Sequence, residues 1–548
     1  MIHMGLDSIT TVDSVVVVWP DRMRSVAKNV KANSVAEIKY QNANTFEYEK
    51  QDNTLFSEVT NEVLATNYSH QDNTVDEFRE QVLLPHQFSK SGPKMAVEDI
   101  NGDGIEDFFV CGSRNSPGKL YLSSSEKWNV KTIQAFEADK LYEDSDATFF
   151  DYDKDGDLDL FVASGGSDQP EGNPLYQNRL YQNTDGNFAK VPFPKTAFNS
   201  SNVLASDFDE DGDLDLFVGG YVKTNRYPNS DKSSFFRNDG DAFMDVTDDW
   251  FPESNLGIVF DATTANLNQD EKEELVIVGE WMPITILNFN GSNFENISTQ
   301  FGMDSTTGWW NSISAADLDG DGDEDLIAGN LGENYKFKVD GKNEFKVFAD
   351  DFDENGTYDV FLANKKGDKL LPVRGKECSS QQMPVINSKF PTYNSFAKAE
   401  LDEILGEKIQ TSTQFKVDIF STVILENNNG TLSPIVLPKE AQFSTVNSMV
   451  VEDFDQDGRL DLLLAGNRFD SEVETTPSDA SLGLLMINKG DMNFAPVPAT
   501  KSGLYLSGNI KDVNWIAGKY LISSENEGPI RIHQLNKDLV TNSVASVN

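Results

Sequence analysis

A nine-residue acidic pattern recurs along this chain, and it constrains the fold more than any other feature of the sequence. Its clearest copy is residues 151–159, DYDKDGDLD, which the apolar residues LFVA follow at once. Carboxylates stand at positions 1, 3, 5, 7 and 9, and glycine stands at position 6. Alternate side chains of a tight loop can converge on one point, and glycine permits the sharp turn between them, so this spacing is typical of a loop that holds a hard cation. Without a cation, the gathered carboxylates would repel one another.

The copies of this pattern are spaced as structural repeats. They begin at Asp99, Asp151, Asp207, Asn266, Asp317, Asp351 and Asp453, and most successive starts are 51 to 59 residues apart. Most loops lie between two short runs of small or apolar residues, and a later turn and run complete each unit. About four strands in a unit of about fifty residues are typical of a propeller blade. We therefore predict an all-β chain that forms a seven-bladed β-propeller with calcium loops, and a last blade near residue 512 that has lost its acidic loop.

Length and charge narrow the class of protein further. The chain has 548 residues, which favours several domains or a repeat architecture over one ordinary core. Its net charge of −45 makes nucleic acid and anionic membrane surfaces poor partners. No apolar run approaches the length of about 18–20 residues that a membrane helix needs, so we expect no direct membrane span. The two cysteines, Cys111 and Cys378, lie in separate repeats, and we expect no disulfide between them.

Two spacings, of 34 and 102 residues, break the period. Together they amount to one period and roughly eighty extra residues. We place the Asp351 loop on the second hairpin of the blade that starts near residue 313. Most of the extra residues then form an insertion over about 362–415, in which residues 395–405 are expected to be one helix, capped by Ser395 and ended by Gly406.

A propeller must also close its ring. The sequence FSEVT at 56–60 resembles FMDVT at 243–247, where the outer strand of an earlier blade is expected. We therefore predict that residues 54–60 supply the outer strand of the last blade, so that deleting residues 53–62 would lower the melting temperature sharply.

The loops, placed between two β-strands, resemble the FG-GAP/VCBS repeats of integrin α-subunit propellers. The N-terminal segment, with GLD at 5–7, VDSV at 12–15 running into WP at 19–20, and NVKAN at 29–33, resembles an ASPIC/UnbV domain. Asp7 and Arg22 stand where that domain usually has glycine. The whole chain resembles the bacterial proteins that combine both domains, a group that includes the cartilage acidic protein family. The expected domains are a partial ASPIC/UnbV-like β domain at 1–41, a linker at 42–52 and the propeller at 53–540.

The geometry of such a loop assigns its ligands to the side chains at positions 1, 3, 5 and 9 and to the backbone carbonyl at position 7. The expected cofactor is Ca²⁺. The candidate metal ligands are Asp99, Asn101, Asp103, Ile105 and Asp107; Asp151, Asp153, Asp155, Asp157 and Asp159; Asp207, Asp209, Asp211, Asp213 and Asp215; Asp317, Asp319, Asp321, Asp323 and Asp325; Asp351, Asp353, Asn355, Thr357 and Asp359; and Asp453, Asp455, Asp457, Arg459 and Asp461. The loop of Asn266, Asn268, Asp270 and Glu274 is degenerate, because Glu271 stands where glycine is usual, and its metal binding is left open.

Repetition argues against catalysis by these loops, since a chemical site would occur once, and we expect no catalytic residue and no organic cofactor. The favoured function is a calcium-stabilised binding, adhesion or scaffold module that recognises a protein or glycan at the cell surface. Its expected location is extracellular or on the outer-membrane surface. The early run at 15–19 is too short for the core of an export signal, so we expect Met1 not to be the native start.

The alternative is a glycan-active enzyme with its site on the loop face, marked by a separate group of acidic and aromatic residues. Trp281, Trp309 and Trp310 are open to two interpretations, as platforms for a sugar ring or as core residues. His86, after LLP, is expected to be a packed or capping residue and not a general base.

Overall fold

The fold was analysed in a computed structural model. The structure describes residues 5–19, 23–40, 44–45, 54–125, 127–240, 242–253, 255–270, 272–340 and 343–536. The chain divides into two compact units, residues 1–53 and 54–548.

The first unit is a small antiparallel sheet. Its order is β1 (Thr11–Val18), β2 (Met23–Lys31) and β3 (Asn44–Thr45). The indole nitrogen of Trp19 donates a hydrogen bond of 2.9 Å to Ser25 Oγ, and Ser25 is buried. Asn44 and Thr45, within the segment 42–52 expected to be a linker, pair with β2. The other residues of that segment, and Arg22, lie outside the described residues.

The second unit contains seven antiparallel sheets of four strands that succeed one another along the described chain, and one of them carries a short fifth strand. The sheets are formed by β5 (Met95–Glu98), β6 (Asp107–Val110), β7 (Lys119–Ser124) and β8 (Lys127–Lys131); by β9 (Asp144–Phe150), β10 (Asp159–Ser164), β11 (Arg179–Thr184) and β12 (Asn187–Val191); by β13 (Ser200–Ser206), β14 (Asp215–Gly220), β15 (Ser234–Asn238) and β16 (Phe243–Asp245); by β17 (Ile258–Ala265), β18 (Glu274–Met282), β19 (Thr285–Phe289), β20 (Phe294–Asn296) and the added β21 (Gly308–Trp309); by β22 (Ser312–Ala316), β23 (Asp325–Gly329), β28 (Val423–Asn427) and β29 (Leu432–Val436); by β30 (Ser448–Glu452), β31 (Asp461–Ala465), β32 (Leu484–Asn488) and β33 (Phe494–Val497); and by β34 (Ile510–Ile516), β35 (Tyr520–Glu525), β36 (Arg531–Leu535) and β4 (Phe56–Glu58).

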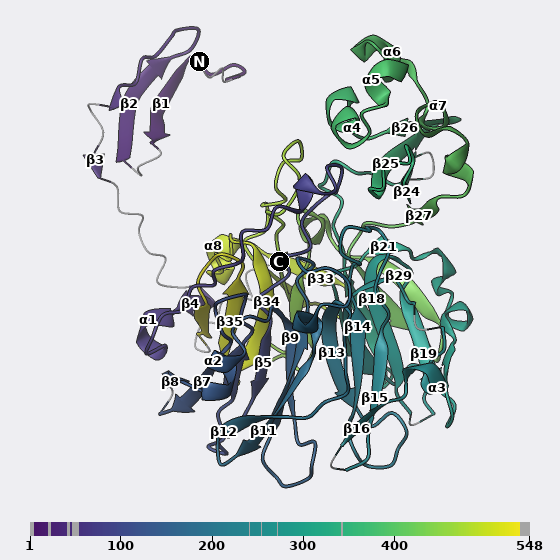
Figure 1. The fold of residues 1–548 in the computed structure, drawn as a ribbon. Coiled ribbons are helices and arrows are strands. Elements are labelled where there is room, and N and C mark those ends of the chain that lie inside the picture. The colour runs from purple at the N-terminus through teal and green to yellow at the C-terminus, as the bar shows by residue number, and fades with distance from the viewer. Residues whose placement is uncertain are drawn as a thin grey trace. The chain divides into compact units, whose positions relative to one another are not determined.

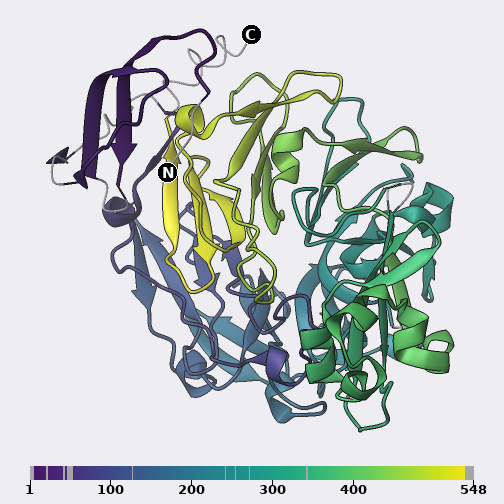
Figure 2. The same ribbon diagram turned by 90° about the horizontal axis from the view of Figure 1, so that it is seen from above.

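The seven sheets close into a ring through their first strands. Each first strand packs against the next one, from β5 through β9, β13, β17, β22 and β30 to β34, and β34 returns to β5. Figure 2 shows the sheets arranged around a common centre. Because each sheet is covered on both faces by its neighbours, the second strands are apolar runs without alternation, and every residue of β10 and β18 is buried. The second unit is thus a propeller-like repeat fold.

The predicted closure of the ring is confirmed. Strand β4 pairs antiparallel with β36, with Phe56 opposite Leu535 and Glu58 opposite His533. The Phe56 side chain is fully buried, and its ring lies 5.9 Å from that of Phe454 in the acidic loop of the preceding sheet. The last sheet therefore takes its outer strand from the beginning of the unit and its other three strands from the end.

The predicted place of the Asp351 loop is wrong. The loop joins β24 (Asn343–Asp350) to β25 (Asp359–Lys366) in an additional sheet of order β26–β25–β24–β27, completed by β26 (Lys369–Pro372) and β27 (Thr413–Val417). The sheet interrupted by this insertion is completed later, by β28 and β29. Strands β24 and β25 pair over eight residues, and β27 and β26 occupy their free edges, which makes the inserted sheet complete in itself. The insertion therefore begins well before residue 362.

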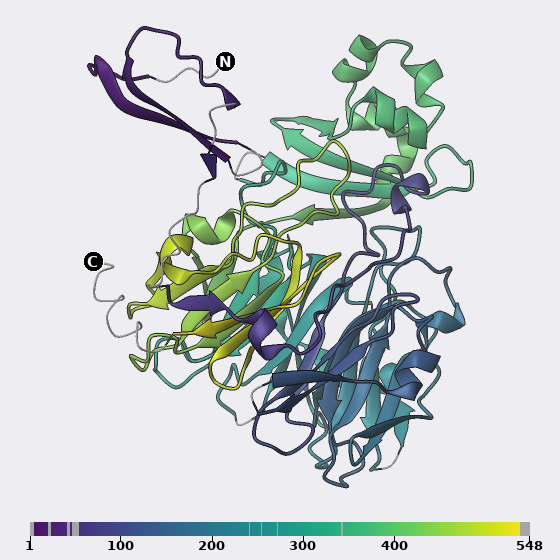
Figure 3. The same ribbon diagram turned by 90° about the vertical axis from the view of Figure 1, so that its left-hand side faces the viewer.

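Short helices cover the inserted sheet (Figures 1 and 3). They are α4 (Lys376–Gln382), α5 (Ile386–Lys389), α6 (Tyr393–Lys398) and α7 (Leu401–Leu405), and their apolar residues form one cluster with Phe348 and Phe361 of the sheet. The single helix predicted over 395–405 is wrong, because the chain is extended at Ala399 and Glu400. Thr392, and not Ser395, is the first N-cap: its side chain accepts a hydrogen bond from the Ser395 amide.

The remaining α-helices of the described chain are single turns: α1 (Thr60–Val63), α2 (Gln134–Ala138), α3 (Thr247–Trp250) and α8 (Ala499–Ser502). Among the described residues, no helix is long and apolar enough to cross a membrane. Cys111 and Cys378 are both buried and free, as expected.

Candidate functional site

The acidic loops share one backbone shape. In the loop that starts at Asp151, Lys154 at position 4 and Gly156 at position 6 both have positive φ, of 59° and 94°. A Cβ added at Gly156 would meet nothing within 4 Å, so the requirement for glycine comes from the backbone conformation and not from lack of space. The two left-handed residues curl the chain so that its first half returns toward position 9.

In the regular loops, the aspartate at position 9 is held in place by backbone hydrogen bonds. Asp159 is fully buried at the start of β10. Its Oδ2 accepts a hydrogen bond of 3.1 Å from the Tyr152 amide, and its Oδ1 accepts one of 2.7 Å from the Asn183 amide on β11. The same two kinds of bond hold Asp215, Asp325 and Asp461. This residue therefore ties each of these loops to the third strand of its own sheet.

Three carboxylates come together in five of the loops. Oxygens at positions 1, 3 and 9 lie within 4.8 Å of one another in the groups Asp151, Asp153 and Asp159; Asp207, Asp209 and Asp215; Asp317, Asp319 and Asp325; Asp351, Asp353 and Asp359; and Asp453, Asp455 and Asp461.

The side chains at positions 5 and 7 lie outside these groups in the described loops. At position 5, Asp155 Oδ1 accepts a hydrogen bond of 2.9 Å from the Asp157 amide. At position 7, Asp157 Oδ2 accepts one of 2.9 Å from the Asp185 amide, in the turn between the third and fourth strands. Arg459, at position 7 of its loop, donates from Nε to the Asn488 carbonyl at 3.0 Å. Position 7 therefore remains suited to contribute its carbonyl and not its side chain.

Unpartnered oxygens in three of the five groups indicate that a hard cation would fit there. Asp151 Oδ1, Asp207 Oδ1, Asp353 Oδ1 and Asp359 Oδ1 are buried and accept no hydrogen bond within the described structure. A buried carboxylate oxygen without a partner costs free energy, and coordination to a cation removes that cost. The donors are oxygen atoms, which suit Ca²⁺ better than a soft transition metal. The loop residues would hold such an ion at positions 1, 3 and 9.

Burial also makes the position-9 carboxylates weak acids when no cation is bound. It raises the pKa of Asp159, Asp215, Asp359 and Asp461 to about 7, and that of Asp107 and Asp325 to about 6, although backbone hydrogen bonds act in the opposite direction. A cation at these loops would therefore compete with protons near neutral pH.

Two loops depart from this arrangement among the described residues. In the first loop, Asn101 Nδ2 donates to Asp107 Oδ1 at 3.1 Å. In the fourth, Asn268 Nδ2 donates to Glu274 Oε1 at 2.6 Å, while Asn266 Oδ1 is buried without a hydrogen bond. In both loops an asparagine amide thus donates a hydrogen bond to the carboxylate at position 9. Neither loop gathers three carboxylates among the described residues. Glu271 lies outside the described residues, and metal binding by the Asn266 loop stays open.

Asparagines on the third strands connect neighbouring sheets through the loops. Asn238 Nδ2 on β15 donates to the Tyr152 carbonyl in the loop of the preceding sheet, at 2.8 Å. Asn427 and Asn488 make the corresponding bonds to the carbonyls of Leu267 and Leu318, at 3.1 and 2.8 Å. A loop that loses its shape therefore disturbs the next sheet as well as its own.

Of the two interpretations left open for the three tryptophans, the structure supports core residues over sugar platforms. Trp281, Trp309 and Trp310 are 4%, 1% and 1% exposed, respectively, and belong to the core. His86 is packed, as expected: its Nε2 lies 2.8 Å from Glu280 Oε2 in the interior.

The centre of the ring contains polar residues that the sequence analysis missed. The residue five positions before each of the six loops that belong to the ring is Lys94, Asp146, Asn202, Asp261, Ser312 or Ser448, and Asp512 is the counterpart in the last sheet. Asp146 Oδ2 accepts a hydrogen bond of 3.0 Å from the Val203 amide, and Asp261 Oδ2 accepts one of 3.0 Å from the Ile313 amide, each on the next sheet. Six of the seven residues line a cavity of about 200 Å³. The constant offset from the loops was the signal that could have revealed them.

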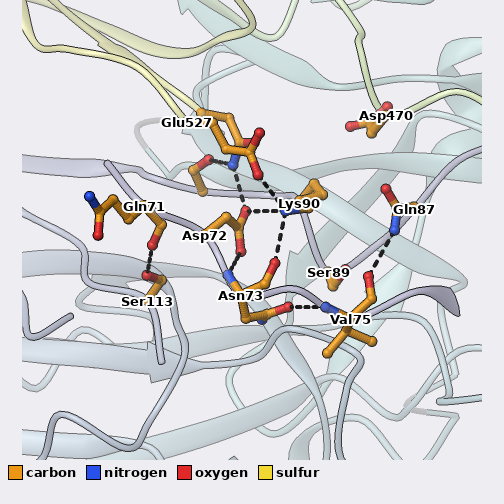
Figure 4. A network of polar contacts seen from close by, with 12 residues as sticks. Gln71, Asp72, Asn73, Val75, Gln87, Ser89, Lys90, Ser113, Asp470 and Glu527 are labelled. Atoms are coloured by element: carbon orange, nitrogen blue, oxygen red, sulfur yellow. Dashed lines mark hydrogen bonds and ion pairs between the residues drawn. The ribbon is translucent and has the colours of Figure 1, made fainter. Parts of the chain in front are cut away.

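The segment of residues 71–90 is held to the ring by polar contacts (Figure 4). Asp72 Oδ2 accepts a hydrogen bond of 2.7 Å from Asn526 Nδ2, and Lys90 Nζ donates one of 2.9 Å to the Asn73 carbonyl. Asn73 Nδ2 in turn donates to the buried Glu143 at 3.1 Å. The segment thereby brings acidic groups together in the interior.

Because Glu143 is buried, we expect the free energy of unfolding to depend on pH. Burial, and then the nearby Asp72, raise the pKa of Glu143 to about 8 from its ordinary value of 4.5. A raised carboxyl pKa favours the folded state at low pH, and this contribution is lost as the pH rises from about 5 through 8, by on the order of 2–4 kcal/mol. Glu143→Gln should therefore flatten the fall in unfolding free energy measured by denaturant titration at pH 5, 6.5 and 8. The exposed Glu137→Gln is the control. Identical pH profiles for wild type and Glu143→Gln would contradict the assignment.

Comparisons with known proteins agree with the domain content inferred from the sequence. The model of the FG-GAP-like repeat matches residues 99–162, 151–218 and 266–328, and the model named ASPIC and UnbV matches residues 1–45. No curated protein sequence matches the chain.

Two solved structures show a distant likeness. One is described as YCF48 bound to D1 peptide, with 10% identity and a TM-score of 0.38, covering 85% of this chain and 98% of that one. The other is the biofilm matrix protein Bap1 of V. cholerae, with 12% identity and a TM-score of 0.30, covering 86% of this chain and 91% of that one. Neither likeness is close enough to bear on function.

Proposed function

We propose that this chain, which carries FG-GAP-like repeats and an ASPIC and UnbV segment, is a calcium-stabilised seven-bladed propeller that acts as an extracellular binding, adhesion or scaffold module. One observation supports this most directly: the same group of three carboxylates occurs five times. A catalytic metal needs an open coordination position and a nearby base, and such a site is built once. A metal that stabilises a repeat can occur in every repeat.

The chemistry of the loops supports a location outside the cell. They lack the bidentate glutamate that completes a high-affinity EF-hand, and weak sites of this kind fill where calcium is about millimolar. The ligand that we propose is a protein or glycan at the cell surface. Binding would then depend on the shape that the calcium-loaded ring gives to its surface loops.

The test is a binding screen of the full chain against glycan and protein panels, with calcium and with chelator, combined with a hydrolysis assay on the same glycans. We expect saturable binding that is lost on chelation, and no turnover. Turnover by a single site would instead support the alternative of a glycan-active enzyme. Binding that is unchanged by chelation would contradict the role proposed for calcium.

Removing the carboxylates of a ring loop should destabilise the ring, whereas removing those of the loop in the inserted sheet should not. Asp151→Asn with Asp153→Asn should lower the free energy of unfolding of the ring by about 2 kcal/mol in millimolar calcium, because Tyr152 of this loop also accepts the bond from the next sheet. Asp351→Asn with Asp353→Asn should remove one bound calcium but spare the main unfolding transition, because that loop lies in the inserted sheet. Calcium stoichiometry by equilibrium dialysis and calorimetric melting measure the two effects. Equal shifts of the main transition would contradict the separation.

A further inference from the structure

A second cavity lies near the centre of the ring, where the first strands of the sheets begin. Its volume is about 50 Å³, and it is lined by residues from several sheets and from residues 86–94. This segment is fixed beside the loop that follows β31: the Gln87 amide donates to the Asp470 carbonyl at 3.0 Å, and the Glu472 amide donates to the Pro85 carbonyl at 3.1 Å. Figure 4 shows Gln87, Lys90 and Asp470 in this region. The cavity is therefore bounded by ordered parts of the fold.

The lining of this cavity is basic, although the chain as a whole carries a net charge of −45. Lys90, Lys94, Arg468 and Lys511 contribute cations, and Asp470 contributes the one carboxylate of the lining. Lys511 Nζ lies 3.2 Å from Asp470 Oδ2, and Lys90 Nζ lies 2.8 Å from Glu527 Oε1. Lys94 lines this cavity and also the larger one described above, where Asp146, Asp261 and Asp512 are its charged neighbours.

Arg468 is the cation whose charge is least compensated. The residue is 5% exposed, and its Nη2 donates a hydrogen bond of 2.9 Å to Asn311 Oδ1, which is a neutral acceptor. Its Nη1 is buried and has no hydrogen-bond partner within the described structure. A buried guanidinium without a carboxylate partner is costly, because desolvation of the charge is not balanced by an ion pair.

The pKa shifts of Asp470 and Lys511 agree with a positive electrostatic potential in this cavity. Burial opposes ionisation of Asp470, but Lys511, Arg468 and His86 together hold the pKa of this carboxyl below its ordinary value. Burial lowers the pKa of Lys511 in spite of the attraction of Asp470, and Arg468 lowers it further. A second anion in the cavity would relieve the repulsion between the two cations.

We propose that this cavity binds a small oxyanion, a phosphate or carboxylate group, with the guanidinium of Arg468 as its principal donor and Lys511 beside it. A guanidinium forms strong charge-assisted hydrogen bonds with such groups, and the buried Nη1 of Arg468 is a donor that no described protein group uses. The volume of about 50 Å³ suits an ion of a few heavy atoms. This site is distinct from the calcium loops and does not depend on the proposed function.

The experiment is isothermal titration of the full chain with inorganic phosphate and, separately, with acetate. Calcium is kept present below the solubility limit of calcium phosphate, and chloride balances the ionic strength. We expect saturable binding of at least one of the two anions, and the comparison distinguishes phosphate from carboxylate as the group preferred. Arg468→Gln should weaken that binding about tenfold or more, whereas Arg468→Lys, which keeps a charge, should retain part of it.

Arg179→Gln is the matched control, because Arg179 is also a buried arginine but lies outside the lining of this cavity and pairs with Asp144. This variant should bind the anion as the wild type does, even if it is less stable. Melting curves in calcium identify the variants that remain folded. If the wild type shows no saturable binding of either anion, or if folded Arg468→Gln and Arg179→Gln bind equally well, the proposal is overturned. The wild-type titration decides the matter even if Arg468→Gln does not fold.

Discussion

Chelation of calcium should destabilise the ring of sheets by several kcal/mol and bring it close to unfolding at room temperature. If a loop binds calcium with a Kd of about 0.1 mM and free calcium is about 2 mM, each site contributes about 1.8 kcal/mol. Four of the five groups lie in the ring and the fifth lies in the inserted sheet, so the ring would lose roughly 7 kcal/mol, which is comparable to the whole stability of an ordinary protein. The structural reason is that each loop otherwise leaves three carboxylates within 4.8 Å of one another, and several of the buried oxygens have no partner.

Thermal unfolding monitored by circular dichroism provides the measurement, in millimolar calcium, in chelator, and in chelator followed by excess calcium. Magnesium is the control ion, because it demands a small octahedral site and releases water reluctantly, so it should restore less stability than calcium. The transition temperature should fall in chelator and recover with calcium. A melting curve that is the same in chelator and in calcium would refute a stabilising role for the loops.

Removal of the closing strand should have the second large effect. Truncation of residues 1–62 deletes β4, opens the last sheet at β36 and exposes the surface that Leu55 and Phe56 cover. Loss of two such buried side chains costs on the order of 6–8 kcal/mol, before the lost strand hydrogen bonds are counted. We expect the truncated chain to be unfolded or aggregated at 25 °C, because β36 would also become an unprotected edge.

Truncation of residues 1–53 is the matched control. It removes the first compact unit and leaves β4 in place. The melting temperature of the second unit should then change by only a few degrees. Differential scanning calorimetry of the two truncated chains compares them directly. If both truncations have equal effects, the contribution of β4 to closure is refuted.

The sequence predicted the repeats well because their signals are local. The loop at 151–159 requires left-handed conformations and alternating carboxylates, and both requirements appear as residue types at fixed spacings. The closure by β4 was also predictable, since residues 56–60 carry the same sequence pattern as an outer strand elsewhere. Even the polar centre of the ring was present in the sequence, as one polar residue five positions before each loop of the ring.

The insertion was mispredicted because local patterns do not say which strands pair. The run at 343–350, the Asp351 loop and the run at 359–366 have the same local character as a blade hairpin. In the structure this hairpin is not part of a blade. Strands β26 and β27 pair with both of its free edges and complete a separate sheet. The helix predicted over 395–405 failed for a similar reason: Phe396, Leu401 and Ile404 reach one cluster only when the chain bends at Ala399.

The sequence by itself determined the all-β repeat, the positions of the acidic loops and the segment that closes the ring, because each is marked by a short local pattern that recurs along the chain. Only the tertiary structure decided which loop oxygens gather and which are left without partners. It also decided that Arg468 is buried in a basic cavity while the chain as a whole is acidic. These features depend on groups far apart in the chain, such as Arg468 and Asn311, which are 157 residues apart, and distances between such groups are set by how the seven sheets pack around a common centre.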